Sequence, residues 1–291
     1  MQLKVLPFVA YIPVKRTNAL QFHAPTFFIP SVICTTNSNS AFLRQCIGDQ
    51  SDSSEKKHQS FPLLSHDVPS ERKNTWILMA TYMFNLHIPL GVGGLSIASY
   101  VFHKPSLDPE TQALSLLFFQ ILELTGSLIL LSSSLKGVEK RDVIKERNWV
   151  LASAVGFFAV LLSVSIVSVV DDAFGLKDVR NNAVREMLSS SAMGRSACIV
   201  VYCFVTPLLE ELVYRRFLLK TLSSTMSWQN AVLISSLTFS AAHFSPQNFV
   251  YIFAIGCVLG SCYSWTGRLA ASFSVHSLYN ALILIISYLL Y

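Results

Sequence analysis

The sequence predicts an all-α membrane protein, a polytopic bundle of about seven transmembrane helices, or eight if the first apolar segment holds two. Composition is the first reason: 52% of the 291 residues are hydrophobic, 13% are charged, and the mean hydropathy is +0.48. A soluble globular domain carries roughly 25% charged residues. The second reason is a series of apolar segments close to the ~20 residues that cross a hydrocarbon core. No strand-like alternation is visible, and helices then satisfy the backbone hydrogen bonds in lipid.

The N-terminal segment has a different character, and we expect residues 1–48 to be a chloroplast transit peptide. They include basic residues but no Asp or Glu, and they are rich in Ser, Thr and Asn, as in TTNSNS. This composition is typical of organelle targeting segments, although a disordered cytosolic tail shares it. Residues 49–75 are polar and predict a flexible lead-in.

Residues 76–291 form the predicted multi-pass membrane domain. Its first apolar segment contains Pro89 and the run GVGG, so we expect a kink or break there. The fifth and sixth segments are short. The seven predicted spans are Trp76–Phe102, Leu114–Leu135, Trp149–Val170, Ala197–Leu219, Trp228–Ser245, Phe249–Trp265 and Leu269–Leu290.

Basic residues outside these segments are unevenly distributed between the two sides of the predicted bundle. The side that holds most of them is the inner one by the positive-inside rule, which is the stroma in a chloroplast. The net charge of +5 is explained by this asymmetry and by the N-terminal segment. No nucleic-acid motif or basic groove is present, so we expect the lipid bilayer, and no nucleic acid, as a partner.

The fourth predicted span carries an unusual concentration of charge in the stretch TPLLEELVYRRFLLK. At about 100° per residue, Glu210 and Glu211 are not expected to face the same partner, whereas Glu211 and Arg215 lie one turn apart on one face. We therefore predict that an ion pair with Arg215 keeps Glu211 ionised and that Glu210 faces a cavity. The alternative is a helix end with charges that reach the membrane surface.

Two later spans carry polar residues of their own. FSAAHF places Phe239 and His243 at i, i+4, and SVHSLYN places His276 and Asn280 at i, i+4, so each pair shares a helix face. Ionisable groups inside a membrane usually face the bundle interior or a watery cavity and mark function. We expect Glu210 and these three polar side chains to converge on one cavity that opens to the stromal side.

The three motifs EELVYR, FSAAH and HSLYN resemble EExxxR, FxxxH and HxxxN of the CAAX prenyl protease and bacteriocin-processing-type intramembrane protease family. The resemblance covers Leu208 to Ala281, and it implies a plant plastid-type member with a protease core at 197–291. It also implies hydrolysis of peptide bonds at or within the membrane. Members of the eukaryotic type remove a tripeptide from a prenylated C-terminus, and the family is labelled metalloprotease.

Peptide hydrolysis needs an activated water, donors for the oxyanion and a source of protons. The resemblance and the residue chemistry assign Glu210 and His243 to the water, His276 and Asn280 to the oxyanion, and Glu211 with Arg215 to holding their helix in register. Glu210, His243 and His276 are also candidate zinc ligands. The H-E-x-x-H spacing of soluble zinc proteases is absent, so we predict a glutamate-activated water with zinc as the open alternative and no other cofactor.

The predicted function is that of an intramembrane endopeptidase of the chloroplast envelope or thylakoid, acting on a peptide or membrane-protein substrate. A chloroplast location favours unprenylated membrane proteins as substrates. One alternative is a proteolytically silent scaffold or chaperone for photosynthetic or pigment-related proteins. Another is a proton-coupled transporter that uses Glu210 and His243 as a relay, although no internal repeat supports transport.

Overall fold

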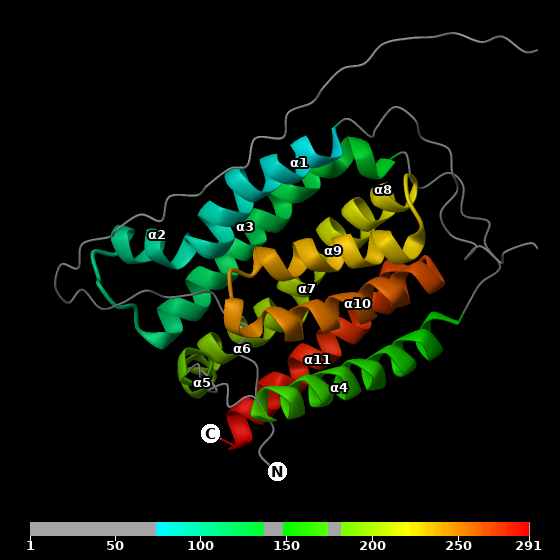
Figure 1. Ribbon diagram of the computed structural model, residues 1–291. Coiled ribbons are helices and arrows are strands. Elements are labelled where there is room, and N and C mark those ends of the chain that lie inside the picture. The colour runs from blue at the N-terminus through cyan, green and yellow to red at the C-terminus, as the bar shows by residue number, and fades with distance from the viewer. Residues whose placement is uncertain (1–73, 137–147, 174–181, 291) are drawn as a thin grey trace, which may run out of the picture. The chain divides into compact units, whose positions relative to one another are not determined.

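The computed structural model describes residues 74–136, 148–173 and 182–290, and within these ranges every regular element is a helix (Figure 1). The predicted all-α class is confirmed. The predicted transit peptide at 1–48 and nearly all of the predicted lead-in at 49–75 lie outside the described residues.

The first predicted span is broken, as expected. It consists of α1 (Thr75–Tyr82), the wide-turned π-helical stretch η1 (Met83–Val92) and α2 (Gly94–Val101). Pro89 lies inside η1, where its ring removes a backbone donor and so favours a helix with a different hydrogen-bond pattern. His87 lies in the same π-helical stretch, and its side chain contacts α3 and α9.

The helix α3 (Pro109–Lys136) starts at a well-formed cap. Asp108 accepts hydrogen bonds from the Thr111 backbone N–H at 3.0 Å and from the Thr111 hydroxyl at 2.9 Å. Pro109 occupies the first helical position, where no backbone donor is needed. The Thr111 backbone N–H, followed by its hydroxyl, lowers the pKa of Asp108, which lies outside the membrane spans.

Five helical stretches in the described ranges are long and apolar enough to cross a membrane: Pro109–Ser132, Trp149–Val169, Ala192–Ser223, Pro246–Thr266 and Leu269–Leu289. The predicted count of seven is not confirmed. The helix α9 (Trp228–Ala242) has 15 residues, or about 22 Å at 1.5 Å per residue, which is shorter than a hydrocarbon core of about 30 Å. The broken first segment also fails to form one long helix.

The stretch Ala192–Ser223 is the central element of the bundle. Other helices enclose it: 61% of its most apolar window is buried, compared with 28% for Trp149–Val169, which leaves most of its surface uncovered by the rest of the described residues. It runs without interruption through α6 (Ala192–Val200), η2 (Val201–Val205), α7 (Thr206–Glu210), η3 (Glu211–Leu219) and α8 (Lys220–Ser223), of which η2 and η3 are π-helical. The short α5 (Asn182–Ser189) precedes it.

The remaining helices pack around this element. The helix α10 (Phe249–Thr266), which follows the single turn η4 (Pro246–Asn248), contacts both α9 and α4 (Trp149–Ala173) (Figure 1). Gly267, with φ of 70°, ends α10 in the left-handed conformation, and its N–H donates to the Tyr263 carbonyl at 2.7 Å. The turn leads into α11 (Leu269–Leu290), which carries His276 and Asn280.

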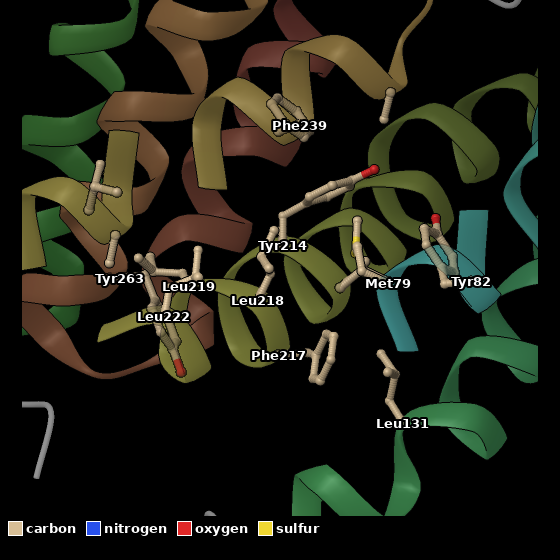
Figure 2. Close-up of a cluster of buried hydrophobic side chains, with 14 of the residues drawn as sticks. Met79, Tyr82, Leu131, Tyr214, Phe217, Leu218, Leu219, Leu222, Phe239 and Tyr263 are labelled. Atoms are coloured by element: carbon tan, nitrogen blue, oxygen red, sulfur yellow. The ribbon is translucent and has the colours of Figure 1, made fainter. Parts of the chain in front are cut away.

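A hydrophobic core surrounds η3. In Figure 2 the η3 side chains, among them Tyr214 and Phe217, lie between Tyr82 and Leu131 on one side and Tyr263 on the other. Tyr214 also packs edge to face against Phe239 of α9, with ring centroids 5.2 Å apart. These contacts hold α1, α3, α9 and α10 against the helix that carries the charged motif.

Candidate active site

Glu210 lies at the junction of α7 and η3, and histidines from two other helices reach its carboxylate. The His243 Nε2 atom is 3.7 Å from Glu210 Oε1, and the His276 Nε2 atom is 3.5 Å from Glu210 Oε2. All three side chains are buried or nearly so. The structure therefore brings together one carboxylate and two imidazoles that are separated by tens of residues in sequence.

The orientation of His243 follows from its position at the end of α9. Its Nδ1 lies 2.7 Å from the Phe239 carbonyl, which can only accept, so Nδ1 carries the hydrogen. In a neutral imidazole Nε2 is then the basic nitrogen, and it faces Glu210. Both atoms are acceptors and lie 3.7 Å apart, so they do not hydrogen-bond to each other, and a molecule with two polar hydrogens, such as water, can donate to both.

His276 bridges the two adjacent glutamates. Its Nδ1 atom is 3.2 Å from Glu211 Oε1, while Nε2 faces Glu210. The expectation that Glu210 and Glu211 do not face the same partner is therefore wrong. An imidazole has nitrogens on two sides of its ring and can span carboxylates about 100° apart, and the helix also changes from α to π between the two residues.

Glu211 and Arg215 form the predicted ion pair. Arg215 Nε is 3.6 Å from Glu211 Oε2, and both side chains are fully buried. The guanidinium lies 4.6 Å from the centroid of the Phe239 ring, and its Nη2 donates to the Gly256 carbonyl at 3.5 Å. Phe239 in turn packs edge to face against His243 at 4.7 Å, so the ion pair and the imidazole share one aromatic support.

Asn280 lies one turn from His276 on α11, but its amide is used elsewhere. Its Nδ2 donates to the Tyr202 carbonyl of η2 at 2.9 Å, and the residue is 4% exposed. This bond ties α11 to the central helix. The predicted oxyanion role of Asn280 depends on its second amide hydrogen and stays a prediction.

A cavity of about 100 Å³ opens beside Glu210 and His243, but neither His276 nor Asn280 is among its lining residues, so the expected convergence of all four side chains on one cavity is only partly met. Its polar lining also includes Tyr82, His87 and Glu123, which the sequence analysis did not single out. Glu123 is the one charged residue between Leu114 and Leu135, and a lone carboxylate within an apolar span is a signal that could have found it. The cavity has room for more than one water molecule.

No group of three or more His, Cys, Asp or Glu side chains among the described residues is arranged to hold a metal ion. This includes the candidate zinc ligands: the His243 and His276 imidazoles lie near the Glu210 carboxylate, but the three side chains do not form such a group.

Comparison with known proteins agrees with the three motifs. Residues 193–282 match the model of a family described as type II CAAX prenyl endopeptidase Rce1-like. We call residues 193–282 the Rce1-like domain, after the model that they match. This domain contains all six residues that the sequence predicts for the site, whereas Tyr82, His87 and Glu123 lie outside it.

A wider similarity extends beyond the Rce1-like domain. The chain is 22% identical over 230 residues to a protein of Bacillus subtilis (strain 168) named "Putative membrane peptidase YdiL". The aligned region covers 74% of this chain and 89% of the relative. No solved structure matches the chain significantly. The domain and this relative support protease activity in a multi-pass membrane protein.

Proposed function

We propose that this protein is an intramembrane endopeptidase that hydrolyses peptide bonds of membrane-associated proteins with a water activated at Glu210 and His243. The observation that carries the proposal is the surroundings of the Glu210 carboxylate. Its two oxygens lie 3.7 and 3.5 Å from Nε2 of His243 and His276, at the wall of a cavity inside an apolar bundle. A carboxylate in this position can accept a proton from a water held between it and an imidazole.

The reaction follows from this arrangement. A water donates one hydrogen to Glu210 and the other to His243 Nε2, and its oxygen attacks the scissile carbonyl as Glu210 removes the first proton. The C–O bond forms, the carbonyl electrons move to the oxyanion, and the C–N bond then breaks as Glu210 passes the proton to the leaving amine. The proposed donors to the oxyanion are the second amide hydrogen of Asn280 and, when its ring carries a hydrogen on both nitrogens, Nε2 of His276.

Glu211 and Arg215 have a supporting role in the proposal. Their buried ion pair fixes the start of η3, and the Glu211 carboxylate holds the His276 ring through Nδ1. An imidazole fixed in this way presents Nε2 toward Glu210 and the reacting group. This is the same use of a carboxylate to orient an imidazole that recurs in hydrolytic sites.

We further propose that the enzyme lies in a chloroplast envelope or thylakoid membrane with its site toward the stroma, and that its substrates are unprenylated membrane proteins. The acid-free N-terminal segment and the distribution of basic residues support this placement. Fusion of residues 1–48 to a fluorescent protein should direct the reporter into chloroplasts, and a cytosolic reporter would contradict the placement.

One observation favours a second candidate function, the proteolytically silent scaffold. A cavity of about 100 Å³ is smaller than the roughly 300–1,000 Å³ of most ligand pockets, so a peptide segment enters only if helices separate. In that case the Glu210 variant described next would keep full function in the plant while deletion of the protein would not.

The test uses the full chain purified in detergent with a fluorogenic peptide library. Glu210→Gln keeps the shape of the side chain and removes the base, so cleavage should fall about 10²- to 10⁴-fold while the melting temperature is retained. Glu186→Gln, at an exposed position of α5, is the matched control and should cleave like the wild type. Equal cleavage by the wild type and Glu210→Gln would contradict the proposed function.

A further inference from the structure

A second buried cluster adjoins the site from the N-terminal helices. Glu123 of α3 is fully buried, and its Oε1 accepts a hydrogen bond from the Tyr82 hydroxyl at 2.8 Å. The His87 Nδ1 lies 2.8 Å from the same oxygen, and the Gln120 amide donates to Oε2 at 3.3 Å. Within the part of the chain that the structure describes, these partners of the carboxylate come from α1, η1 and α3, outside the Rce1-like domain.

His87 connects the cluster to the end of α9. Its Nε2 lies 3.0 Å from the Ala242 carbonyl, and its ring stacks on Phe244 at 6.5 Å between centroids and 20° between planes. Ala242 and Phe244 are the two chain neighbours of His243. Phe244 has φ of 48°, a left-handed conformation that costs a residue with a side chain free energy and persists only where its surroundings hold it.

Glu123 is connected to the Glu210 helix as well. Gln120, which donates to Glu123, accepts a hydrogen bond from the Thr206 hydroxyl at 3.2 Å. Thr206 begins α7 and lies one helical turn before Glu210 on the same face. Glu123 is therefore linked to two parts of the site. His87 connects it to the residues next to His243, and Gln120 connects it to the helix that carries Glu210.

The contacts of His87 indicate support of the site and not proton transfer to substrate. The Ala242 carbonyl only accepts, so Nε2 carries a hydrogen, and Nδ1 faces a carboxylate. Both ring nitrogens are engaged by protein atoms, so neither is available to a substrate. A histidine held on both sides in this way is suited to fixing the distance between two helices.

We propose that His87, held by Glu123 and Tyr82, is a positioning residue that fixes the end of α9 so that the His243 imidazole faces Glu210. The inference rests on the proposed function, because that function gives His243 its role. Gly91 allows the close packing on which the contact between His87 and Glu123 depends. A Cβ at Gly91 would lie 2.7 Å from Glu123 Oε2 and 3.1 Å from His87 Nδ1, so the close approach of η1 to α3 needs glycine there.

The test compares His87→Leu with His87→Gln, using the library peptide that the wild type cleaves fastest. Leucine has no donor for the Ala242 carbonyl, and we expect kcat to fall about 10- to 100-fold while KM changes by less than about twofold. Glutamine can donate to that carbonyl and should recover most of the lost kcat. A wild-type kcat in His87→Leu, or equal losses in both variants, would overturn the proposal.

A second readout separates this inference from the proposed function. The imidazole ¹⁵N resonances of His243, assigned by their loss in His243→Asn, should shift in His87→Leu and stay unchanged in Glu186→Gln. If the wild type and Glu210→Gln cleave alike, the proposed function fails, and this shift still decides whether His87 positions His243. Unshifted His243 resonances in His87→Leu would overturn the positioning role whatever the cleavage rates are.

Discussion

Two buried carboxylates adjoin the same cavity, and their surroundings differ. Glu123 accepts hydrogen bonds at both oxygens, from Tyr82 and Gln120, and lies against His87. Glu210 has an oxygen, Oε2, that is buried and makes no hydrogen bond within the part of the chain that the structure describes. Buried polar groups are normally satisfied, and an exception calls for an explanation such as a catalytic role. The satisfied carboxylate supports the site, and the unsatisfied one is suited to the reaction.

The largest effect on stability is expected at the buried ion pair of Glu211 and Arg215, next to Glu210 in the chain. Arg215→Met leaves Glu211 charged, buried and without its main partner, which should reduce the free energy of unfolding by about 3–5 kcal/mol. Chemical denaturation in detergent measures the change. Arg185→Met, at an exposed position of α5, is the control. The double variant Glu211→Gln, Arg215→Met should recover part of the loss, and additive losses would show that the two side chains are not coupled.

The comparison of the two carboxylates predicts a smaller loss for Glu123→Gln. The amide cannot accept from every donor around it, so at least one of them loses its partner, and the free energy of unfolding should fall by about 1–3 kcal/mol. Glu210→Gln should melt at or above the wild-type temperature, because it removes a buried charge without such a network. The reverse order of melting temperatures would break the distinction between the two sites.

An effect of similar size is expected at the glycines that let η1 and α3 approach. Gly91→Ala should destabilise the fold by about 1–3 kcal/mol, since its Cβ meets the fixed Glu123 carboxylate at 2.7 Å. A Cβ at Gly126 would lie 2.8 Å from the Leu86 Cδ2 atom, and this flexible apolar side chain can move away. Thermal melting should therefore rank Gly91→Ala as the more damaging substitution, and the opposite ranking would argue against a rigid Glu123 cluster.

Much of the fold and of the Rce1-like part of the site could be predicted because the signals are local. Pro89 marked the break in the first segment, and the i, i+4 spacing of Glu211 and Arg215 predicted their ion pair. The count of seven spans was not confirmed because apolar composition does not show that α9 stops after 15 residues. The shared partner of Glu210 and Glu211 was missed because a regular α-helix was assumed.

The second cluster could not be assembled from sequence spacing. His87 and Glu123 lie 36 residues apart on different helices, and their contact depends on the π-helical turn around Pro89 and on the absence of a side chain at Gly91. The Asn280 bond to the Tyr202 carbonyl likewise joins two helices through a backbone atom, which no motif encodes. Tertiary packing, and not local propensity, decides these pairs.

The central claim is that Glu210 performs the chemistry while Glu123 holds the framework, and one paired kinetic experiment tests it most directly. Single-turnover cleavage of the same peptide should be slowed about 10²- to 10⁴-fold in Glu210→Gln and no more than about 10- to 100-fold in Glu123→Gln. Equal rates in the two variants, or a slower reaction in Glu123→Gln than in Glu210→Gln, would contradict this division of roles.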